Sequence, residues 1–302
     1  MALRAPYIAP AVTSLLEQSF QRCRVVLWLA EEEFTPQSIP AELQALQGRE
    51  RLEIRLCPDM GPCKKLIPAL QAFPGAIICT AGDDLLHHRR RLAELLLSWL
   101  EEPRAIHRHL RRLCLSDLQH LRMLSYRHWP LAEVNQRSTF TTVFRGGSGV
   151  LCPPRSLPSA ACSYTTARML CPGADDLWFW AQAVTHGTRL RRVRDSTYEE
   201  RGLIIYQNRT LYDVNRTAND QHLQRLWQAL PQLRRRLPEE CGLTPAAAGS
   251  ETGHPEPRTS GTAVRRDRRG AAAAETRTRV MRGEGELRPA WRPASDFPAL
   301  RD

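Results

Sequence analysis

The stretch Arg24-Val25-Val26-Leu27-Trp28-Leu29 decides the fold class, because it is a short β-branched and aromatic run bounded by polar residues. Such a run is typical of a strand buried on both faces of a parallel sheet. Further along the chain, the alternating run Leu52-Glu53-Ile54-Arg55-Leu56 predicts a second strand, and Ala76-Ile77-Ile78-Cys79-Thr80 predicts a third. The third run ends at Gly82-Asp83-Asp84.

Helical spacing separates these runs. Apolar residues lie three or four positions apart at Val12, Leu15, Leu16 and Phe20, and again at Leu92, Leu95, Leu96 and Trp99. Residues 65–73 also predict a helix, whereas Pro6 and Pro10 favour irregular backbone over residues 1–10. Strands that alternate with helices predict an α/β sheet with crossover connections, not an all-helical or all-β domain.

The composition changes after Glu240 to Ala, Arg, Gly, Pro, Thr and Glu. This stretch cannot bury enough apolar surface to offset chain entropy. We therefore expect a folded domain over residues 1–240, with its core ending near Leu237, and a disordered low-complexity tail over residues 241–302.

The net charge of +11 and the pI near 9.6 suit a partner with phosphates, whether nucleic acid, a membrane surface or a nucleotide. Lys64 and Lys65 are the only lysines among the 43 basic residues. No nucleic-acid partner is expected, since neither an aromatic-interleaved basic motif nor a helix-turn-helix signature is present.

The nine cysteines are scattered and include no C-x-x-C pair, so they predict neither a disulfide framework nor a structural zinc site. No apolar run approaches the roughly 20 residues that span a bilayer, and the amino terminus lacks the order of a secretory signal. A cytoplasmic location is expected. The histidines at 87, 88, 107, 109, 120 and 128 show no metal spacing, and we expect surface or capping roles for most of them.

The acidic pair Asp83-Asp84 follows a predicted strand directly. Ligands gather at the carboxyl ends of strands in open α/β sheets, and two carboxylates there can hold Mg²⁺ or Mn²⁺ and clamp a diphosphate. The same pair also makes a good turn or a helix cap.

A second acidic pair, Asp175-Asp176, precedes an apolar helical run. One carboxylate could act as a general base, or Asp175 or Asp176 could cap the helix, which the helix dipole favours. Between the two pairs lies Gly146-Gly147-Ser148-Gly149, whose glycines permit close backbone approach to a ligand or form a tight turn without one. The glycine spacing matches neither a dinucleotide fingerprint nor a phosphate loop.

Together these motifs resemble a bacterial group of family-two-like glycosyltransferases with the GT-A fold, a Rossmann-like arrangement. The resemblance covers roughly residues 9–230. It rests on several motifs in the right order: Val25-Val26-Leu27-Trp28-Leu29-Ala30-Glu31-Glu32-Glu33-Phe34, Lys64-Lys65-Leu66-Ile67-Pro68-Ala69-Leu70, Thr80-Ala81-Gly82-Asp83-Asp84, Gly147-Ser148-Gly149-Val150-Leu151-Cys152-Pro153-Pro154, Ala174-Asp175-Asp176-Leu177-Trp178-Phe179 and Asn215-Arg216-Thr217-Ala218-Asn219-Asp220-Gln221.

The resemblance implies a mixed, mostly parallel sheet flanked by helices and a specific role for each motif. Asp84 is the expected metal ligand for Mn²⁺ or Mg²⁺, and Asp83 is an expected nucleotide contact. Asp176 corresponds to the catalytic base of inverting members, and Asp175 is its supporting neighbour. The expected contacts to the nucleotide-sugar come from two further motifs: Lys64, Lys65, Gly147 and Gly149.

The chain departs from the group's pattern in two places. Gly82 stands where the group usually has a third aspartate. Members also begin with an apolar strand before the helix matched here by residues 12–21, so the first strand is expected to be missing, through a late start or a damaged gene.

The function implied by the resemblance is metal-dependent, inverting transfer of a sugar from a nucleotide-diphosphate donor, in particular a uridine one. The acceptor is a hydroxyl of a cell-surface glycan or lipid-linked glycan in polysaccharide biosynthesis, which is compatible with a peripheral contact with the inner membrane surface. The alternative is an inactive, truncated relative that folds or binds glycan without turnover.

Overall fold

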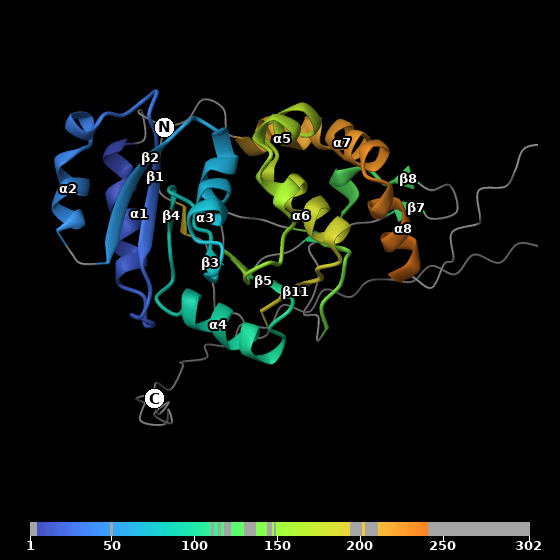
Figure 1. The fold of residues 1–302 in the computed structure, drawn as a ribbon, viewed down its shortest axis with the longest axis horizontal. Helices are drawn as coiled ribbons and strands as arrows, with labels where there is room; N and C mark the ends of the chain where they lie inside the picture. The colour runs from blue at the N-terminus through green and yellow to red at the C-terminus, as the bar shows by residue number, and fades with distance from the viewer. Residues whose placement is uncertain are drawn as a thin grey trace, which may run out of the picture. The chain divides into compact units, whose positions relative to one another are not determined.

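The computed structural model describes residues 5–48, 51–109, 112–113, 116–117, 122–129, 137–143, 147, 149–193, 201–202 and 211–240. Near the amino terminus, strand β1 (Val25–Ala30) pairs in parallel with β2 (Leu52–Cys57), with Val25 opposite Leu52 and Ala30 opposite Cys57. Helix α2 (Ala41–Gln47) lies between these strands in the chain and packs beside helix α1 (Ala5–Leu16) (Figure 1). These elements bury their own apolar cluster around Ile8, Leu29 and Leu43.

A four-stranded sheet has the order β11 (Leu190–Arg192), β5 (Ile106–Arg108), β10 (Val150–Cys152) and β3 (Ile78–Cys79). Strand β10 runs antiparallel to both of its neighbours, whereas β5 and β11 are parallel. With helices between its strands, the chain has the mixed α/β class that the sequence predicts. Among the described strands, the pairs β1–β2 and β5–β11 are parallel, and the other named pairs are antiparallel.

The remaining elements are short strand pairs and helices. The antiparallel pairs are β4 (Leu85–Leu86) with β12 (Arg201–Gly202), β6 (Arg112–Leu113) with β9 (Thr142–Val143), and β7 (Ser116–Asp117) with β8 (Arg122–Met123). The α-helices that follow α2 are α3 (Ile67–Ala72), α4 (Arg91–Glu101), α5 (Tyr164–Leu170), α6 (Asp175–His186), α7 (Leu211–Ala229) and α8 (Pro231–Glu240). Short 3-10 turns are η2 (Pro36–Ser38), η3 (Gly61–Lys65), η4 (Tyr126–His128) and η6 (Ser159–Cys162). None of the helices in the described part of the chain is both long and apolar enough to cross a bilayer.

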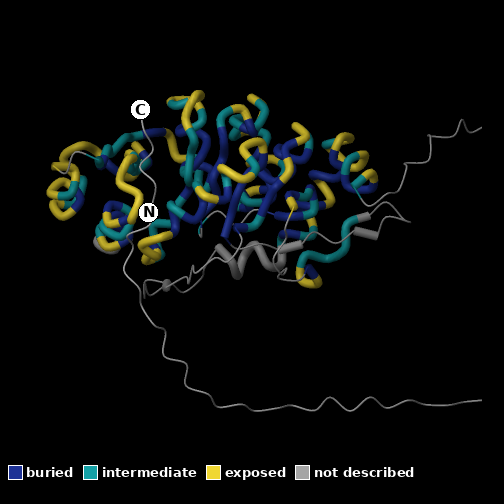
Figure 2. Tube along the Cα trace, turned by 90° about the horizontal axis from the view of Figure 1, so that it is seen from below, coloured by how far each residue is buried: buried dark blue, intermediate teal, exposed yellow. Residues whose placement is uncertain are grey.

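The main core surrounds α6, whose residues 177–181 are at most 2% exposed. A helix that is apolar all round is stable only when other elements cover it, and α5, α7 and α8 pack against this one. The indole N–H groups of Trp178 and Trp180 donate to the carbonyl oxygens of Ala161 (2.9 Å) and Phe140 (2.8 Å), so neither is buried unsatisfied. In Figure 2 the dark blue, buried stretches run through the middle of the tube.

Three predicted elements are confirmed to within about a residue at each end, namely β1, β2 and α4. The prediction of irregular backbone over residues 1–10 is wrong, because α1 starts at Ala5. Pro6 lies in the first helical turn, where its missing N–H has no intrahelical bond to lose, and Pro10 is on the exposed side of the helix. Strand β3 is shorter than predicted. The predicted tail over residues 241–302 lies outside the described residues.

Candidate functional site

The first group of predicted site residues meets where η3 leads into α3 beside the amino end of α6. Lys65 is the last residue of η3, and Asp175 is the first residue of α6. Lys65 Nζ lies 2.9 Å from Asp175 Oδ2, and the two side chains are 27% and 8% exposed. This ion pair joins two of the predicted site motifs that lie far apart in the chain.

The charges of this pair depend on each other. Burial lowers the pKa of Lys65, but the carboxylates of Asp175 and Asp176 outweigh it and raise that pKa above its ordinary value. Burial raises the pKa of Asp175 to about 6, against the opposing effect of Lys65. At neutral pH, Lys65 is therefore protonated and Asp175 is ionised. Burial also raises the pKa of the neighbouring Cys63 thiol, which stays protonated.

Asp176 differs from Asp175 in its accessibility. Asp175 is buried, whereas Asp176, the next residue of α6, is only half-buried. The N-cap residue of α6 is Ala174, and its side chain makes no capping hydrogen bond. The two carboxylates therefore lie in the first helical turn, where the helix dipole favours negative charge, and neither of them is the cap.

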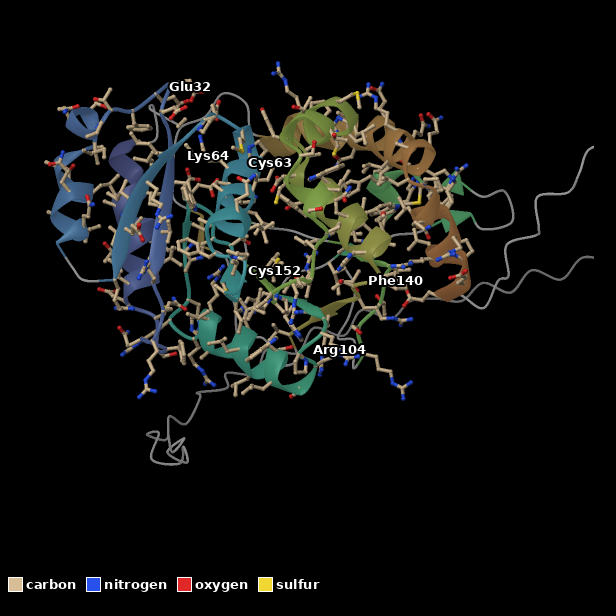
Figure 3. The ribbon with its side chains drawn as sticks, in the orientation of Figure 1. Glu32, Cys63, Lys64, Arg104, Phe140 and Cys152 are labelled. Atoms are coloured by element: carbon tan, nitrogen blue, oxygen red, sulfur yellow. The ribbon has the colours of Figure 1, made fainter. Side chains whose placement is uncertain are left out.

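Lys64 belongs to a second charged group, at the carboxyl ends of the parallel strands β1 and β2. Its Nζ donates to Asp59 Oδ1 at 3.0 Å, and this hydrogen bond holds the pKa of Asp59 below its usual range. The backbone N–H of Asp59 donates to both carboxylate oxygens of Glu32, at 3.0 and 2.8 Å. Figure 3 labels Glu32, Cys63 and Lys64 at this end of the molecule.

Sequence reasoning did not select Glu32 or Asp59. The signal was available, because each is a charged residue shortly after a predicted strand, and polar side chains gather at the carboxyl ends of parallel strands. From the sequence alone, the run Glu31-Glu32-Glu33 cannot be distinguished from an ordinary solvated loop. The contact of Glu32 with Asp59 is known only from the structure.

The Gly82-Asp83-Asp84 loop contacts Gly147, a residue of the predicted glycine motif. The N–H of Gly82 donates to the carbonyl oxygen of Gly147 at 3.1 Å, and the carbonyl oxygen of Gly82 accepts a hydrogen bond from His87 Nε2 at 2.9 Å. A Cβ atom at position 82 would lie 3.0 Å from Asp84 Oδ1. Glycine at this position therefore gives the Asp84 carboxylate room to lie over the loop. Asp83 and Asp84 are both half-buried.

Gly149 has a structural reason that requires no ligand. Its φ is +111°, and a Cβ atom there would lie 2.5 to 2.8 Å from the guanidinium group of Arg91. Arg91 is 2% exposed and donates to the carbonyl oxygen of Thr80. For this residue the tight-turn interpretation is sufficient, and the predicted contact with a nucleotide-sugar stays a prediction.

The acidic loop can be tested as a metal site by its donor set. Among the described residues, no group of three or more His, Cys, Asp and Glu side chains is arranged to hold a metal ion. Asp83 and Asp84 offer two carboxylates in one loop. Because Mg²⁺ is usually held by one or two carboxylates together with substrate phosphates, this set fits a metal that binds jointly with a diphosphate.

Three histidines depart from the predicted surface or capping roles. His87, His107 and His109 are buried, and each donates a ring N–H to a backbone carbonyl oxygen, those of Gly82, Glu102 and Arg91. Burial lowers their pKa values to about 3, 4 and 3. They are neutral at physiological pH, so they serve packing and not acid-base chemistry. His88 and His128 are exposed, as predicted.

No family model matches the chain, and no curated protein matches it. Among solved structures, the chain is similar to the mannosyltransferase PcManGT from Pyrobaculum calidifontis, which was solved in complex with GDP-Man and Mn²⁺. The two share 18% sequence identity with a TM-score of 0.42, over 82% of this chain and 73% of that one. A likeness of this degree says nothing about the substrate or the activity of this chain.

Proposed function

We propose that this chain is a glycosyltransferase that moves a sugar from a nucleotide-diphosphate donor, in particular a uridine one, to an acceptor hydroxyl. The observation that carries the proposal is the Lys65–Asp175 ion pair. This ion pair fixes the amino end of α6 and thereby sets the position of Asp176. Of the two neighbouring aspartates, Asp176 is more accessible than Asp175.

Asp176 is the proposed general base. Its carboxylate takes the proton of the acceptor hydroxyl as that oxygen attacks the anomeric carbon, a bond to the acceptor forms, and the bond to the diphosphate breaks on the opposite face. The sugar is therefore transferred with inversion. Asp175 does not suit this role, because it is 8% exposed and Lys65 occupies one of its oxygens.

The donor diphosphate is proposed to lie along the Gly82-Asp83-Asp84 loop. Asp84 would hold Mn²⁺ or Mg²⁺, which supplies positive charge to the departing diphosphate when bound. Asp83 would contact the nucleotide. The adjacent Gly147 supports this placement, because its carbonyl oxygen holds the loop through the N–H of Gly82.

The acceptor is proposed to be a cell-surface glycan or lipid-linked glycan, with the reaction on the cytoplasmic face of the membrane.

A second candidate is a relative that binds a nucleotide or a glycan without turnover. One specific observation favours it. Both lysines that the resemblance assigns to the nucleotide already form ion pairs within the chain, Lys64 with Asp59 and Lys65 with Asp175. A nucleotide phosphate would have to compete with these carboxylates.

The test combines turnover with donor binding, measured on the full chain. Uridine diphosphate release from uridine diphosphate sugars is measured with Mn²⁺ for the natural chain, for Asp176→Asn and Asp84→Asn, and for the control Glu42→Gln, at an exposed position of α2. We expect Asp176→Asn to lower turnover by about 10²- to 10⁴-fold while Mn²⁺-dependent binding of uridine diphosphate, measured by calorimetry, is kept. Asp84→Asn should lose that binding, and Glu42→Gln should change both readouts little.

Each result separates the candidates. Mn²⁺-dependent binding without turnover of any donor would favour the second candidate. The absence of both binding and turnover in the natural chain would contradict both. Equal turnover in the natural chain and in Asp176→Asn would remove Asp176 from the role of base.

A further inference from the structure

Helix α4 buries Leu92 and Leu95, but it also buries two charged side chains and leaves two leucines exposed. Arg91, its first residue, and Glu94 are 2% and 7% exposed. By contrast, Leu97 is 49% exposed and Leu100 is 63% exposed. Ordinary surface helices bury leucines and expose charges, so the outer face of α4 does not have the composition of a solvated surface.

The outward apolar residues form a stripe. Ala93, Leu97 and Leu100 are spaced three and four positions apart and therefore lie on one side of the helix. Leu97 and Leu100 are exposed and Ala93 is half-buried, whereas Leu96 packs against the inner cluster around Leu95. Figure 1 shows α4 along the lower edge of the ribbon. We call Ala93, Leu97 and Leu100 the α4 stripe.

The inner face of α4 already has its partners. Leu95 is fully buried in a cluster with Leu151 and Val193. Ser98 Oγ hydrogen-bonds His107 Nδ1 at 2.8 Å. The helix is therefore fixed in its orientation by the sheet below it, and it cannot rotate to bury the α4 stripe.

Basic residues lie at both ends of the α4 stripe. Arg89 and Arg90 directly precede the helix, and Arg104 follows it; all three are exposed. Figure 3 labels Arg104 beside the carboxyl end of α4. Within the described part of the chain, none of the three forms an ion pair. Two acidic residues also lie at this end, Glu101 and Glu102, and both contact Arg191, which offsets one of their two charges.

We propose that the α4 stripe and its flanking arginines form a docking surface for an anionic lipid bilayer. The helix would lie parallel to the membrane, with Leu97 and Leu100 in the boundary between headgroups and acyl chains and with the arginines on the lipid phosphates. An apolar stripe flanked by arginine is the pattern of interfacial helices that bind anionic lipid.

Charge complementarity favours a bilayer over a second copy of the chain. Counting Arg89, Arg90, Arg104 and Arg191 against Glu101 and Glu102, the charges around the α4 stripe sum to a positive value, and the whole chain carries a net charge of +11. Pairing two copies through this face would bring two surfaces of positive charge together, which is unfavourable. An anionic membrane removes that repulsion. The inference does not depend on the proposed enzymatic function, although it would hold such an enzyme close to a lipid-linked acceptor.

The test is binding of the full chain to vesicles of phosphatidylcholine with one third phosphatidylglycerol, measured by co-sedimentation. The double variant Leu97→Gln/Leu100→Gln should lower the partition coefficient by about tenfold or more, because two apolar side chains no longer enter the interface. The matched control is Met169→Gln, on α5, since Met169 is 66% exposed and lies outside the stripe. It should bind as the natural chain does.

The electrostatic part is tested by Arg89→Gln/Arg90→Gln/Arg104→Gln, which should lose about fivefold in binding for each arginine. Binding of the natural chain should also fall in high salt and on pure phosphatidylcholine. Thermal melts check that every variant is folded, since all these positions are exposed.

Three results would overturn the proposal. The first is unchanged vesicle binding by Leu97→Gln/Leu100→Gln, and the second is an equal loss of binding by Met169→Gln. The third is a dimer of the natural chain, detected by analytical ultracentrifugation, that dissociates in Leu97→Gln/Leu100→Gln while no vesicle binding is seen.

Discussion

Lys65 Nζ contacts Asp175 Oδ2 at 2.9 Å, and through this ion pair the start of α3 is tied to the start of α6. Both charges lie in a partly desolvated region, next to the core residues Cys63 and Leu66. Removing one partner of such a pair leaves the other charge without compensation, which costs far more than the loss of an exposed ion pair.

We expect Lys65→Met to lower the free energy of unfolding by about 3 kcal/mol, because it leaves Asp175 buried without its cation. The matched control is Lys64→Met. Asp59, the partner of Lys64, is 46% exposed and stays hydrated, so the loss there should be about 1 kcal/mol or less. Urea unfolding of the two variants measures the difference.

The double variant Lys65→Met/Asp175→Asn completes the comparison. If the ion pair is the cause, replacing Asp175 should restore part of the stability lost in Lys65→Met. Equal losses in Lys65→Met and Lys64→Met would show that the 2.9 Å contact carries no special weight.

The packing of Gly149 against Arg91 gives a second prediction. Gly149→Ala should destabilise the fold by about 2 kcal/mol or more, because the residue has a φ of +111° and the new Cβ would overlap the Arg91 guanidinium group. Gly147→Ala is the control, since a Cβ there would meet only Leu85 Cδ1 at 3.6 Å. Thermal melts of both variants test this prediction. A smaller decrease in melting temperature for Gly149→Ala than for Gly147→Ala would contradict it.

Acid should weaken the fold through the buried histidines. The pKa of His107 is lowered from 6.5 to about 4, chiefly by burial. Between pH 6.5 and pH 4, His107 binds a proton in the unfolded chain but stays neutral in the folded chain. The free energy of unfolding is therefore highest above pH 6.5 and falls as the pH drops toward 4. At pH 5 the contribution of His107 to this loss is about 2 kcal/mol.

The measurement is urea unfolding at pH 7 and at pH 5. His107→Gln should lose about 2 kcal/mol less than the natural chain over this interval, whatever its stability at pH 7. His88→Gln serves as the control because His88 is exposed, and it should lose as much as the natural chain. The same loss in all three proteins would exclude His107 as the acid-sensitive group.

Local patterns in the sequence were sufficient to predict the positions of the helices and strands whose apolar residues face a core. Strands β1 and β2 and helix α4 lie where alternation and helical spacing place them. The mixed α/β class followed from their order. Local patterns failed for His107 and His109. All residues of β5, which lies between β10 and β11, are buried, His107 among them, and His109 directly follows this strand and is buried too.

The site could be predicted only in pieces. Lys65 and Asp175 were identified in two separate motifs, and so were Gly82 and Gly147. Their contacts with each other were not predicted. Which motif meets which depends on how α3 and α6 each pack against η6, and no spacing in the sequence contains that information. For the same reason Glu32 and Asp59 were missed, since their hydrogen bond exists only once β1 and β2 are paired.

Leu237 is the last residue of the buried apolar cluster, and Glu240, at the end of α8, makes polar contacts beyond it. Its Oε2 accepts from the N–H of Phe140 at 2.6 Å, and its Oε1 accepts from Arg189 at 2.9 Å. The Glu240 side chain is 12% exposed.

We therefore expect Glu240→Ala to lower the free energy of unfolding by about 2 kcal/mol, because it removes hydrogen bonds to a charged acceptor and leaves the N–H of Phe140 without its partner. Glu239→Ala is the matched control, since Glu239 is 49% exposed and faces only Arg235, at 3.7 Å. Its melting temperature should stay unchanged, whereas that of Glu240→Ala should fall by about 4 to 8 °C. A chain cut after Glu240 should melt as the full chain does, and a cut after Leu237 should reproduce the loss seen in Glu240→Ala. If the cut after Glu240 destabilises the domain as much as the cut after Leu237, residues beyond 240 contribute to the core and the assigned boundary is wrong.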